Sequence, residues 1–282
     1  MTDKYAVIGN PISHSKSPLI HQMFAAQNGQ DISYEAILAP LDGFAATVER
    51  LRNEGYKGCN VTVPFKFEAF QLATRDVIAG IAKAVNTLKF ADDQIMGYNT
   101  DGIGLTDDLQ FNLEINLKNE RVLLVGAGGA ASSVVHALAN LGAIVTIVNR
   151  NREKAQLLAT PRLSFSANNA KKYDSHRIVA LGYADLADQQ FDIIINATSA
   201  GLTNSEIPLP PTIFAPDALA YDMMYGRETP FMKFAREHGA AVVSDGLGML
   251  VEQAAESFFL WHNVRPDSQA VLKKLRAELP VA

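Results

Sequence analysis

The chain has 282 residues, a net charge of −5, 48% hydrophobic residues and 20% charged residues. This length predicts about two domains, and the composition is that of a soluble globular protein with ample apolar residues for two cores. The acidic balance excludes a general attraction to nucleic acid or anionic membrane, and the single cysteine, Cys59, excludes an intramolecular disulfide and a cysteine-built zinc site. The N-terminus does not have the pattern of a signal peptide and no apolar run is long enough to span a bilayer, so we expect a soluble, cytoplasmic protein.

The first part of the chain alternates strand-like and helix-like segments. Apolar runs bounded by turn residues predict strands at residues 5–8, 33–38 and 58–63, and a hairpin of residues 85–90 and 94–98. Helical spacing of apolar residues predicts one helix from Pro18 to about Asn28 with Ser17 as N-cap, one capped by Asp42, and one or two between residues 65 and 82. The alternation indicates an α/β sheet.

The segment from Arg121 to Arg150 contains a βαβ unit. A strand at residues 122–125 leads into Gly126-Ala127-Gly128-Gly129-Ala130-Ala131, then an Ala-rich helix to about Leu141 and a strand at residues 144–148. The turn fits G-x-G-x-x-A, in which Gly126 permits the tight turn, Gly128 lets the backbone approach a pyrophosphate, and Ala131 allows close packing. Free N–H groups at the helix start favour phosphate. A structural turn without a ligand is the alternative, and a dinucleotide site is the better interpretation.

The remaining elements complete a second sheet. We expect a helix with Thr100 or Asp101 as cap to about Gln110, helices at residues 152–159 and 230–238, an irregular polar stretch at 168–176, and strands at 191–196, 218–224 and 241–244. Two C-terminal helices, at residues 247–261 and 268–279, should pack back onto the first sheet. The expected fold is a two-domain α/β architecture. A discontinuous substrate-binding and catalytic α/β domain comprises residues 1–101 and 247–282, and a Rossmann-type, doubly wound domain comprises residues 102–246.

Polar residues gather at four places in the first domain. The loop that contains Ser13, Ser15 and Ser17 exposes several hydroxyls where a helix begins, and helix capping explains only one of them. Lys66 lies at a helix start, where the dipole disfavours a cation, although most lysines are simply exposed. The last two clusters contain Asn86 and Asp101, which flank turns at strand ends where α/β sheets bind ligands. Taken singly, each cluster has a structural explanation.

Together these segments resemble a known family. In chain order, GNPISHSKSPLIH, NVTVPFK, AVNT, NTDGIG, VGAGGAA, NR, NATSAG and DGLGMLVEQAA are similar to the motifs of shikimate dehydrogenases over nearly the whole sequence. The resemblance implies NADPH-dependent reduction of 3-dehydroshikimate to shikimate, a step toward chorismate and the aromatic amino acids. At residue 83 this chain has lysine where the family commonly has glycine.

The resemblance also implies the substrate site. Ser15 and Ser17 should hold the substrate carboxylate. The residues expected at the ring hydroxyls and carbonyl are Thr62, Lys66, Asn86, Asp101 and Gln253, and Tyr225 resembles a tyrosine that faces the substrate. Lys66 and Asp101 resemble the catalytic pair, because hydride transfer to a ketone creates an alkoxide that a lysine ammonium can protonate while a carboxylate orients it. Which member of the pair moves the proton stays open.

The cofactor is expected to be NADP(H). After the strand at residues 144–148 come Asn149, Arg150, Asn151, Arg152 and Lys154, where an NAD-specific unit commonly has Asp or Glu. A guanidinium binds a 2′-phosphate through two charge-assisted hydrogen bonds, so Arg150 should dominate and Lys154 should contribute less. The other cofactor-binding residues that the resemblance implies are Gly126, Ala127, Gly128, Gly129, Ala130, Thr198, Met223, Gly246 and Met249. The methionines could equally fill a core. No metal is expected.

Two other functions remain open. A quinate/shikimate dehydrogenase paralogue would have to fit an extra hydroxyl beside the serine loop, and Ser15, Ser17, Thr62 and the basic segment favour the shikimate-specific branch. A catalytically silent ligand sensor on the same fold would not need an intact pair of Lys66 and Asp101. The expected partner is a small-molecule substrate, with no nucleic acid and no membrane, in a monomer or homodimer.

Overall fold

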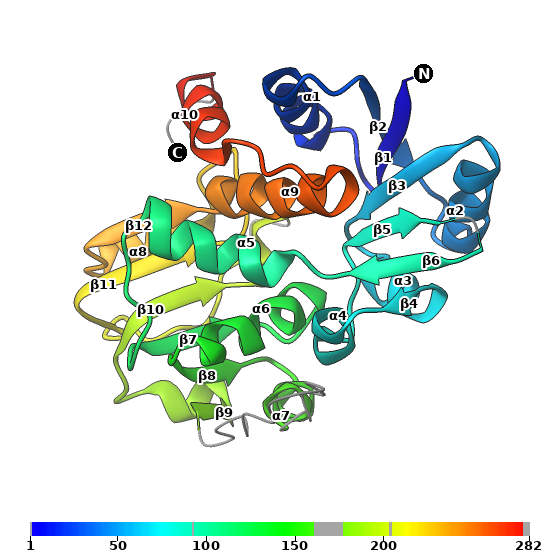
Figure 1. The fold of residues 1–282 in the computed structure, drawn as a ribbon. Coiled ribbons are helices and arrows are strands. Elements are labelled where there is room, and N and C mark those ends of the chain that lie inside the picture. The colour runs from blue at the N-terminus through cyan, green and yellow to red at the C-terminus, as the bar shows by residue number, and fades with distance from the viewer. Residues whose placement is uncertain (1, 92, 161–176, 203–204, 279–282) are drawn as a thin grey trace. The chain divides into compact units, whose positions relative to one another are not determined.

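The computed structural model describes residues 2–91, 93–160, 177–202 and 205–278, which form two compact units (Figure 1). Unit 1 comprises Met1–Gly104 and Leu250–Leu275, and unit 2 comprises Leu105–Met249 and Arg276–Ala282. The chain passes between the units within helices α5 (Asp101–Asp107) and α9 (Leu247–His262), and again near the end of α10 (Ser268–Glu278). The sequence placed the domain boundaries at the first residues of α5 and α9. The irregular stretch expected at residues 168–176 lies outside the described residues.

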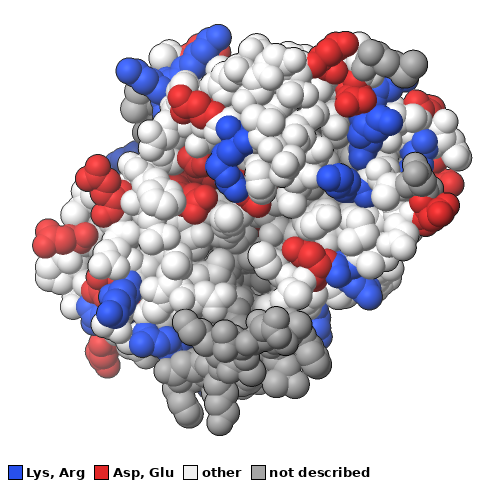
Figure 2. All heavy atoms as spheres, viewed as in Figure 1, with Lys and Arg blue, Asp and Glu red and all other residues white. Residues whose placement is uncertain are grey.

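Charged side chains of both signs are interspersed over the described residues of the face seen in Figure 2. Arg50 and Glu54, with their side chains about half exposed, form one such pair, and Arg121 and Asp192 form another. Exposed pairs of this kind contribute only about 0–1 kcal/mol each, so the fold depends on its buried clusters. In the described parts of the chain, no helix combines the length and apolarity needed to cross a membrane.

Unit 1 is built on a mixed sheet with the strand order β2-β1-β3-β5-β6-β4. Its strands are β1 (Asp3–Gly9), β2 (Ile32–Leu38), β3 (Tyr56–Val61), β4 (Thr74–Arg75), β5 (Thr87–Phe90) and β6 (Ile95–Tyr98). β1 pairs with β2 and β3 in parallel, whereas β5 pairs antiparallel with β3 and β6, which confirms the expected hairpin. The short strand β4 was not predicted, because two residues carry no alternation that a pattern could reveal.

Four helices of unit 1 are α1 (Ser17–Asn28), α2 (Phe44–Asn53), α3 (Lys66–Leu72) and α4 (Val77–Ala82). Two predicted caps are wrong. The N-cap of α1 is Lys16 and that of α2 is Gly43, so Ser17 begins the first helix and Asp42 precedes the cap of the second. Lys83 ends α4 in the left-handed region, with a φ of 51°. Glycine adopts this conformation without steric cost, which explains the glycine that the family commonly has there.

Unit 2 is a fully parallel sheet with the order β12-β11-β10-β7-β8-β9. Its strands are β7 (Arg121–Val125), β8 (Ile144–Val148), β9 (Ile178–Leu181), β10 (Phe191–Asn196), β11 (Phe214–Asp222) and β12 (Val242–Asp245). The order reverses between β7 and β10, which is the topological switch point of a Rossmann fold. The predicted doubly wound sheet is therefore confirmed. Sequence analysis missed β9, which follows directly on the stretch of residues 161–176.

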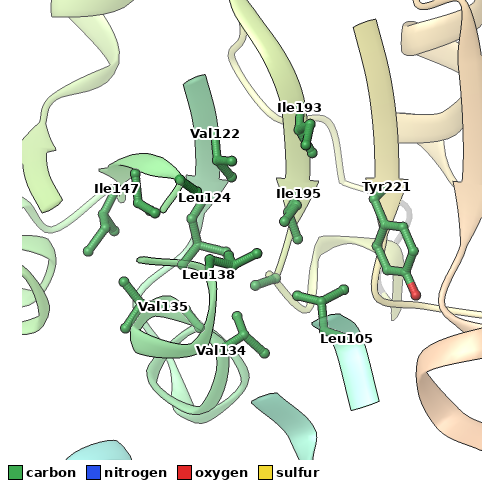
Figure 3. Close-up of a cluster of buried hydrophobic side chains, with 14 of the residues drawn as sticks. Leu105, Val122, Leu124, Val134, Val135, Leu138, Ile147, Ile193, Ile195 and Tyr221 are labelled. Carbon is green, nitrogen blue, oxygen red and sulfur yellow. The ribbon is translucent and has the colours of Figure 1, made fainter. Parts of the chain in front are cut away.

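Helices cover both faces of this sheet, because residues of each strand alternate between two apolar clusters. Val122 and Leu124 of β7 pack with α6 (Gly129–Asn140) and α7 (Arg152–Ala159), as Figure 3 shows for α6. Their neighbours Leu123 and Val125 pack on the other face with α8 (Pro230–Glu237). α5 passes into a π-helical turn, Asp108–Asn112, instead of continuing as the expected α-helix to Gln110.

Aromatic rings of α1, β2 and α9 pack together in unit 1, on the face of the sheet opposite to α2. His21 stacks on Tyr34 with ring centroids 4.3 Å apart and an interplanar angle of 6°. Trp261 stacks on Tyr5 at 4.6 Å, and Phe258 meets Phe24 edge to face at 5.8 Å. Burial, reinforced by the neighbouring His262, lowers the pKa of His21 to about 3. The imidazole is therefore neutral near pH 7.

The depressed pKa of His21 makes the stability of the fold depend on pH. Between about pH 6.5 and pH 3 the unfolded chain binds a proton that the folded chain does not, so the free energy of unfolding falls as pH falls, by about 1.4 kcal/mol per pH unit. His21→Phe retains an aromatic ring and removes this titration. We expect urea unfolding between pH 4 and pH 6.5 to show a shallower loss of stability in the variant. Parallel curves for the two proteins would contradict the assignment.

Helices α5 and α9 approach closely at Gly104. A Cβ atom on this residue would lie 2.6 Å from Cβ and 2.7 Å from the backbone N of Gln253. We therefore expect Gly104→Ala to lower the free energy of unfolding by about 1–3 kcal/mol, since α9 has to shift. Gly80→Ala in α4 is the matched control, because its Cβ meets no described atom within 4 Å. It should raise stability by about 0.5–1 kcal/mol. Urea unfolding of both variants measures the difference, and equal effects would exclude close packing as the cause.

Candidate functional site

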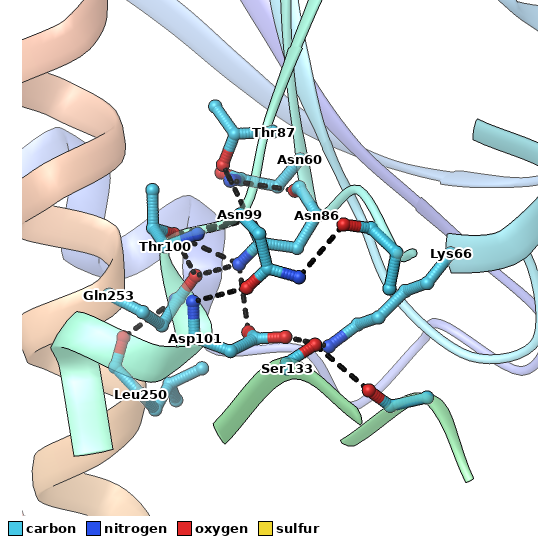
Figure 4. Close-up of polar contacts among 12 residues, drawn as sticks. Asn60, Lys66, Asn86, Thr87, Asn99, Thr100, Asp101, Ser133, Leu250 and Gln253 are labelled. Carbon is cyan, nitrogen blue, oxygen red and sulfur yellow. Dashed lines mark hydrogen bonds and ion pairs between the residues drawn. The ribbon is translucent and has the colours of Figure 1, made fainter. Parts of the chain in front are cut away.

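The core of the candidate site is an ion pair inside unit 1. Nζ of Lys66 lies 2.5 Å from Oδ2 of Asp101, and the two side chains are only 15% and 6% exposed. Lys66 begins α3 and Asp101 begins α5. The N-terminal end of a helix favours the carboxylate but not the ammonium, so the carboxylate is the partner that compensates Lys66. Figure 4 shows the pair with the polar groups around it.

Local packing fixes the position of Lys66. The preceding residue, Phe65, is fully buried and stacks on Phe44 of α2 with centroids 5.1 Å apart. The backbone carbonyl of Lys66 accepts a hydrogen bond from the N–H of Val85 at 3.0 Å. The start of α3 is thus held both by the core and by the segment that leads into β5.

Asn86 holds the other oxygen of Asp101. Its Nδ2 donates to Oδ1 of Asp101 at 2.8 Å and to Oγ1 of Thr100 at 2.9 Å, and it lies 3.3 Å from Oε1 of Gln253. Its Oδ1 accepts the backbone N–H of Thr100 at 2.8 Å. A backbone N–H can only donate and a carboxylate can only accept, so the amide of Asn86 has a single consistent orientation. The sequence predictions of Lys66, Asn86, Asp101 and Gln253 as neighbours are consistent with this geometry.

A layer of buried hydroxyls lies behind Asn86. Oγ of Ser257 lies 2.8 Å from Oγ1 of Thr87 and 3.2 Å from Oγ1 of Thr100, and donates to the carbonyl of Gln253 at 3.0 Å. Nδ2 of Asn60 lies 2.9 Å from Ser257 and 3.0 Å from Thr87. Sequence analysis missed Ser257. Its position in the sequence could have indicated a buried polar role. Ser257 lies one helical turn after Gln253 and is surrounded by Ala254, Ala255 and Phe258.

The serine loop and Thr62 also lie in unit 1. The hydroxyl of Ser15 accepts the N–H of Ser17 at 3.3 Å, and Ser17 is buried. Thr62 follows the last residue of β3, and its N–H donates to the carbonyl of Ile8 at 2.9 Å. These residues therefore lie at the carboxyl ends of β1 and β3, two neighbouring parallel strands. The remaining predicted substrate residue, Tyr225, belongs to unit 2, in the turn that follows β11.

The glycine turn of unit 2 has the form expected for a phosphate site. Gly126 has a φ of 113°, which favours glycine, and the segment of Ala197 and Thr198 lies 3.1 Å from the position of an added Cβ. At Gly128 an added Cβ would meet no described atom within 4 Å. No described side chain caps the first turn of α6, which starts at Gly129 and contains Ala130. The amides of this turn are therefore available to an anion, and Ala127 is half-buried beside them.

The basic segment after β8 is exposed. Asn149 donates to the carbonyl of Asn151 at 2.8 Å, and Oδ1 of Asn151 accepts the N–H of Lys154, so Asn151 caps α7. Arg152 forms an ion pair of 3.5 Å with Asp185. The guanidinium of Arg150 makes no hydrogen bond or ion pair with a described residue. Among the described residues, Arg152 is thus paired with a carboxylate, whereas the side chains of Arg150 and Lys154 are not.

The other predicted cofactor residues follow the carboxyl ends of β10 to β12, and Met249 lies in the first turn of α9. Oδ1 of Asn196 accepts both the N–H and the hydroxyl of Thr198, at 3.0 and 2.7 Å. Gly246 packs on the carbonyl of Met223, with 2.5 Å to an added Cβ. Met249 is buried in the same apolar cluster against which Met223 packs, so both methionines also fill core space. In the described residues no group of three His, Cys, Asp or Glu side chains is arranged to hold a metal ion.

Comparisons with known proteins agree with one family. Residues 7–88 match the shikimate dehydrogenase substrate-binding domain, residues 109–204 match the shikimate/quinate 5-dehydrogenase family, and residues 246–276 match the shikimate 5′-dehydrogenase C-terminal domain. The NADP⁺ shikimate dehydrogenase of Methylobacillus flagellatus is 54% identical over 98% of this chain and 99% of its own length.

Two solved structures extend the likeness to the fold. An Ael1 enzyme from Pseudomonas putida is 46% identical with a TM-score of 0.87, covering 97% of this chain and 98% of that one. Shikimate 5-dehydrogenase from Thermus thermophilus, in complex with NADP(H) and shikimate, is 30% identical with a TM-score of 0.84, covering 99% of this chain and 100% of that one. The chain therefore belongs to the shikimate dehydrogenase family.

Proposed function

We propose that this chain catalyses the reversible, NADPH-dependent reduction of 3-dehydroshikimate to shikimate in the biosynthesis of chorismate and aromatic amino acids. The observation that carries the proposal is the buried ion pair of Lys66 and Asp101, with Asn86 locked beside it. Full-length relatives named NADP⁺ shikimate dehydrogenase support the substrate and the cofactor. Neither the quinate paralogue nor the silent sensor is favoured by these relatives.

Residues of unit 1 would supply the proton that the reduction requires. NADPH, held by the residues of unit 2, would supply the hydride for the ketone carbon. Lys66 would donate a proton to the carbonyl oxygen as negative charge develops on it, and Asp101 would orient the ammonium and stabilise its charge. In the direction of shikimate oxidation, a neutral Lys66 would accept the hydroxyl proton. The amide of Asn86 holds Asp101 in place. It cannot flip without losing the hydrogen bond that it accepts from the N–H of Thr100.

The remaining polar residues would bind the substrate. Ser15 and Ser17 would hold its carboxylate, because their hydroxyls stand where α1 begins. Thr62, Asn86, Gln253 and Tyr225 would contact the ring hydroxyls and the carbonyl. In this assignment residues 1–101 and 247–282 form the substrate-binding domain, and residues 102–246 form the NADP-binding domain.

The residues of unit 2 fit NADP(H). The turn from Gly126 to Ala130 would hold the pyrophosphate on the amides at the start of α6, since an added Cβ at Gly128 meets no described atom. Arg150 would bind the 2′-phosphate, with Asn149, Asn151, Arg152 and Lys154 around it. Thr198, Met223, Gly246 and Met249 would line the nicotinamide end.

We also propose that the protein works in the cytoplasm as a monomer or homodimer without nucleic-acid partners. The acidic net charge of −5 supports the absence of a nucleic-acid partner. Size-exclusion chromatography with light scattering tests the oligomeric state, and a mass above that of a dimer would contradict it.

The assay of the purified protein tests the proposed reaction. Shikimate should reduce NADP⁺ with a rise in absorbance at about 340 nm, the band of reduced nicotinamide. Quinate and NAD⁺ should give much lower specificity constants. Lys66→Ala should lower kcat by about 10²–10⁴-fold, the usual contribution of general acid–base catalysis, and should still bind shikimate in calorimetry.

Lys89→Ala is the matched control for this variant, because Lys89 is a part-buried lysine of unit 1 that donates to the carbonyl of Leu260 at 2.7 Å. It should retain kcat. Full turnover by Lys66→Ala would rule out the proposed pair. No turnover of shikimate by the unaltered protein with either nucleotide would rule out the reaction, and binding of shikimate without turnover would favour the sensor.

Arg150→Gln tests the choice of cofactor. Loss of a charge-assisted contact worth about 1.5–3 kcal/mol should raise KM for NADP⁺ by about 10- to 150-fold. KM for NAD⁺ should stay within about 2-fold, because NAD⁺ has no 2′-phosphate. Lys154→Gln should have a smaller effect, since lysine lacks the planar fork. Titration of NADPH fluorescence gives the same comparison without turnover. An equal loss of affinity for the two nucleotides would contradict the role of Arg150.

A further inference from the structure

Asp245, the last residue of β12, is a buried carboxylate that joins two segments of unit 2. Its Oδ1 accepts the N–H of Leu247 at 3.3 Å, in residues 246–249, which we call the α9 start. Its Oδ2 accepts the N–H of Gly226 at 3.4 Å, in residues 223–226, which we call the β11 turn. The two oxygens of one side chain therefore fix the position of the α9 start relative to the β11 turn.

The two segments also touch each other through their backbones. The N–H of Gly246 donates to the carbonyl of Met224 at 2.8 Å. A Cβ atom on Gly246 would lie only 2.5 Å from the carbonyl oxygen of Met223. Farther along the α9 start, Met249 is buried in the apolar cluster against which Met223 packs. Because the contact is this close, a displacement of one segment has to move the other.

A second carboxylate lies next to Asp245. Asp222 is its partner in the parallel pairing of β11 with β12 and is fully buried, and side chains at paired positions project from the same face of a sheet. Burial raises the pKa of the Asp222 carboxyl group, and the negative charge of Asp245 adds to the rise. The donors to Asp222 are neutral: Asn196, Thr229 and the N–H of Met224. They do not offset the repulsion between the two carboxylates, so a nearby cation stabilises the arrangement.

Arg276 is this cation. It lies in the last turn of α10, and its Nη1 is 2.5 Å from Oδ1 of Asp245, in the same unit. The arginine side chain is 45% exposed and that of Asp245 only 4%, so the guanidinium reaches from the surface to a buried carboxylate. Loss of such a partner leaves a buried charge uncompensated, which costs more than loss of a pair that is exposed on both sides.

We propose that Arg276 is a positioning residue of this enzyme, which acts through Asp245 to hold the β11 turn against the α9 start and so sets the position of the nicotinamide ring. The inference rests on the proposed function, in which Met223, Gly246 and Met249 line the nicotinamide end of the cofactor. The position of this ring matters for hydride transfer, because small misplacements of reacting groups lower the rate greatly.

Arg276→Gln retains a polar side chain and removes its charge. We expect kcat/KM to fall by about 5- to 30-fold with NADP⁺ and by the same factor with NAD⁺, because both nucleotides carry the same nicotinamide. Arg150→Gln, in contrast, should act on NADP⁺ alone. The affinity for 2′-phospho-ADP-ribose, which has no nicotinamide, should stay within about 2-fold in calorimetry. A general loss of folded protein would weaken the binding of all these nucleotides.

Arg121→Gln is the matched control. Arg121 is also an arginine of unit 2, its side chain is 49% exposed, and its Nη2 lies 2.6 Å from Oδ1 of Asp192. Arg121 begins β7, so this pair lies at the amino end of the strand, whereas the proposed nucleotide site follows the carboxyl ends. The control should leave kcat/KM unchanged with both nucleotides. Arg276→Lys retains the charge and should keep most of kcat/KM.

Asp245→Asn breaks the same ion pair from its other side. It leaves no buried charge, so it should fold even if Arg276→Gln does not, and it should show the same equal loss with both nucleotides. In a double-mutant cycle, Arg276→Gln should lower kcat/KM much less in the Asp245→Asn protein than in the unaltered one. Thermal unfolding of all variants shows whether stability changes in parallel.

Four results would each overturn the proposal: an unchanged kcat/KM in Arg276→Gln, a loss with NADP⁺ alone, an equal loss of affinity for 2′-phospho-ADP-ribose, or equal fold-changes in the two backgrounds of the cycle. An unaltered protein that oxidises shikimate with neither nucleotide would instead contradict the proposed function.

Discussion

The side-chain amide of Asn86 is the constraint on which the arrangement of Asp101 and Lys66 depends. It joins an obligate donor, the backbone N–H of Thr100, to an obligate acceptor, the carboxylate of Asp101. If this amide flipped, its NH₂ group would face the Thr100 N–H and its oxygen would face the Asp101 carboxylate. Both hydrogen bonds would then be lost. The orientation of Asn86 therefore fixes where Asp101 points, and Asp101 fixes Lys66. The position of the proposed catalytic pair thus depends on a neutral side chain.

Both proposed binding regions lie at the carboxyl ends of parallel strands, for the same geometric reason. In a parallel sheet all these ends lie along one edge, so residues from distant parts of the chain meet there. In unit 1 the serine loop follows β1 and Thr62 follows β3. In unit 2 the glycine turn follows β7, Arg150 follows β8, and Thr198 follows β10. In both units a turn that follows a parallel strand presents polar groups. These groups are backbone amides in unit 2 and side-chain hydroxyls in unit 1.

Much of this organisation was predictable from the sequence. The apolar runs at β7, β8 and β10 are unambiguous, because a strand buried on both faces is continuously hydrophobic. The turn from Gly126 was predictable because only glycine adopts its backbone without strain. Helix-dipole and strand-end arguments drew attention to Lys66, Asn86 and Asp101. Their roles and that of Gln253 were predicted from motifs, since no spacing rule shows that these residues meet. The serine loop was visible as hydroxyls in excess of what one helix cap requires.

Other features were not predictable, because they depend on tertiary contacts. Ser17 and Asp42 are good cap residues by type, yet the helices begin at positions set by the packing of α1 and α2 on the sheet. Ser257 looks like a neutral position in an apolar helix, and only the fold brings it within 2.8 Å of Thr87. Tyr34 reads as one aromatic residue of a half-buried strand. Its hydrogen bond to Asn60 joins strands whose pairing order no local pattern specifies.

Buried carboxylates occur in both units, and they differ in the kind of group that donates hydrogen bonds to them. Asp222 of unit 2 is fully buried, and it accepts hydrogen bonds from Asn196, from Thr229 and from the N–H of Met224. Burial raises the pKa of this carboxyl group, and its partners are all neutral protein groups. Such a carboxylate organises a strand end, and the hydrogen bonds that it accepts all come from protein groups.

Asp101 differs because one of its partners is a cation with hydrogens to spare. A lysine ammonium has three N–H donors, and in the described residues of unit 1 Lys66 directs one of them to Asp101. Desolvation of an ion pair is costly and is rarely offset by the pair alone. The pair is retained here with the hydrogen bonds of Asn86 around it, at a place where the remaining ammonium hydrogens have no acceptor among the described residues. A fold that needed only stability could replace both residues with apolar ones. The spare hydrogens of the Lys66 ammonium therefore support the proposal that a ligand accepts from this group.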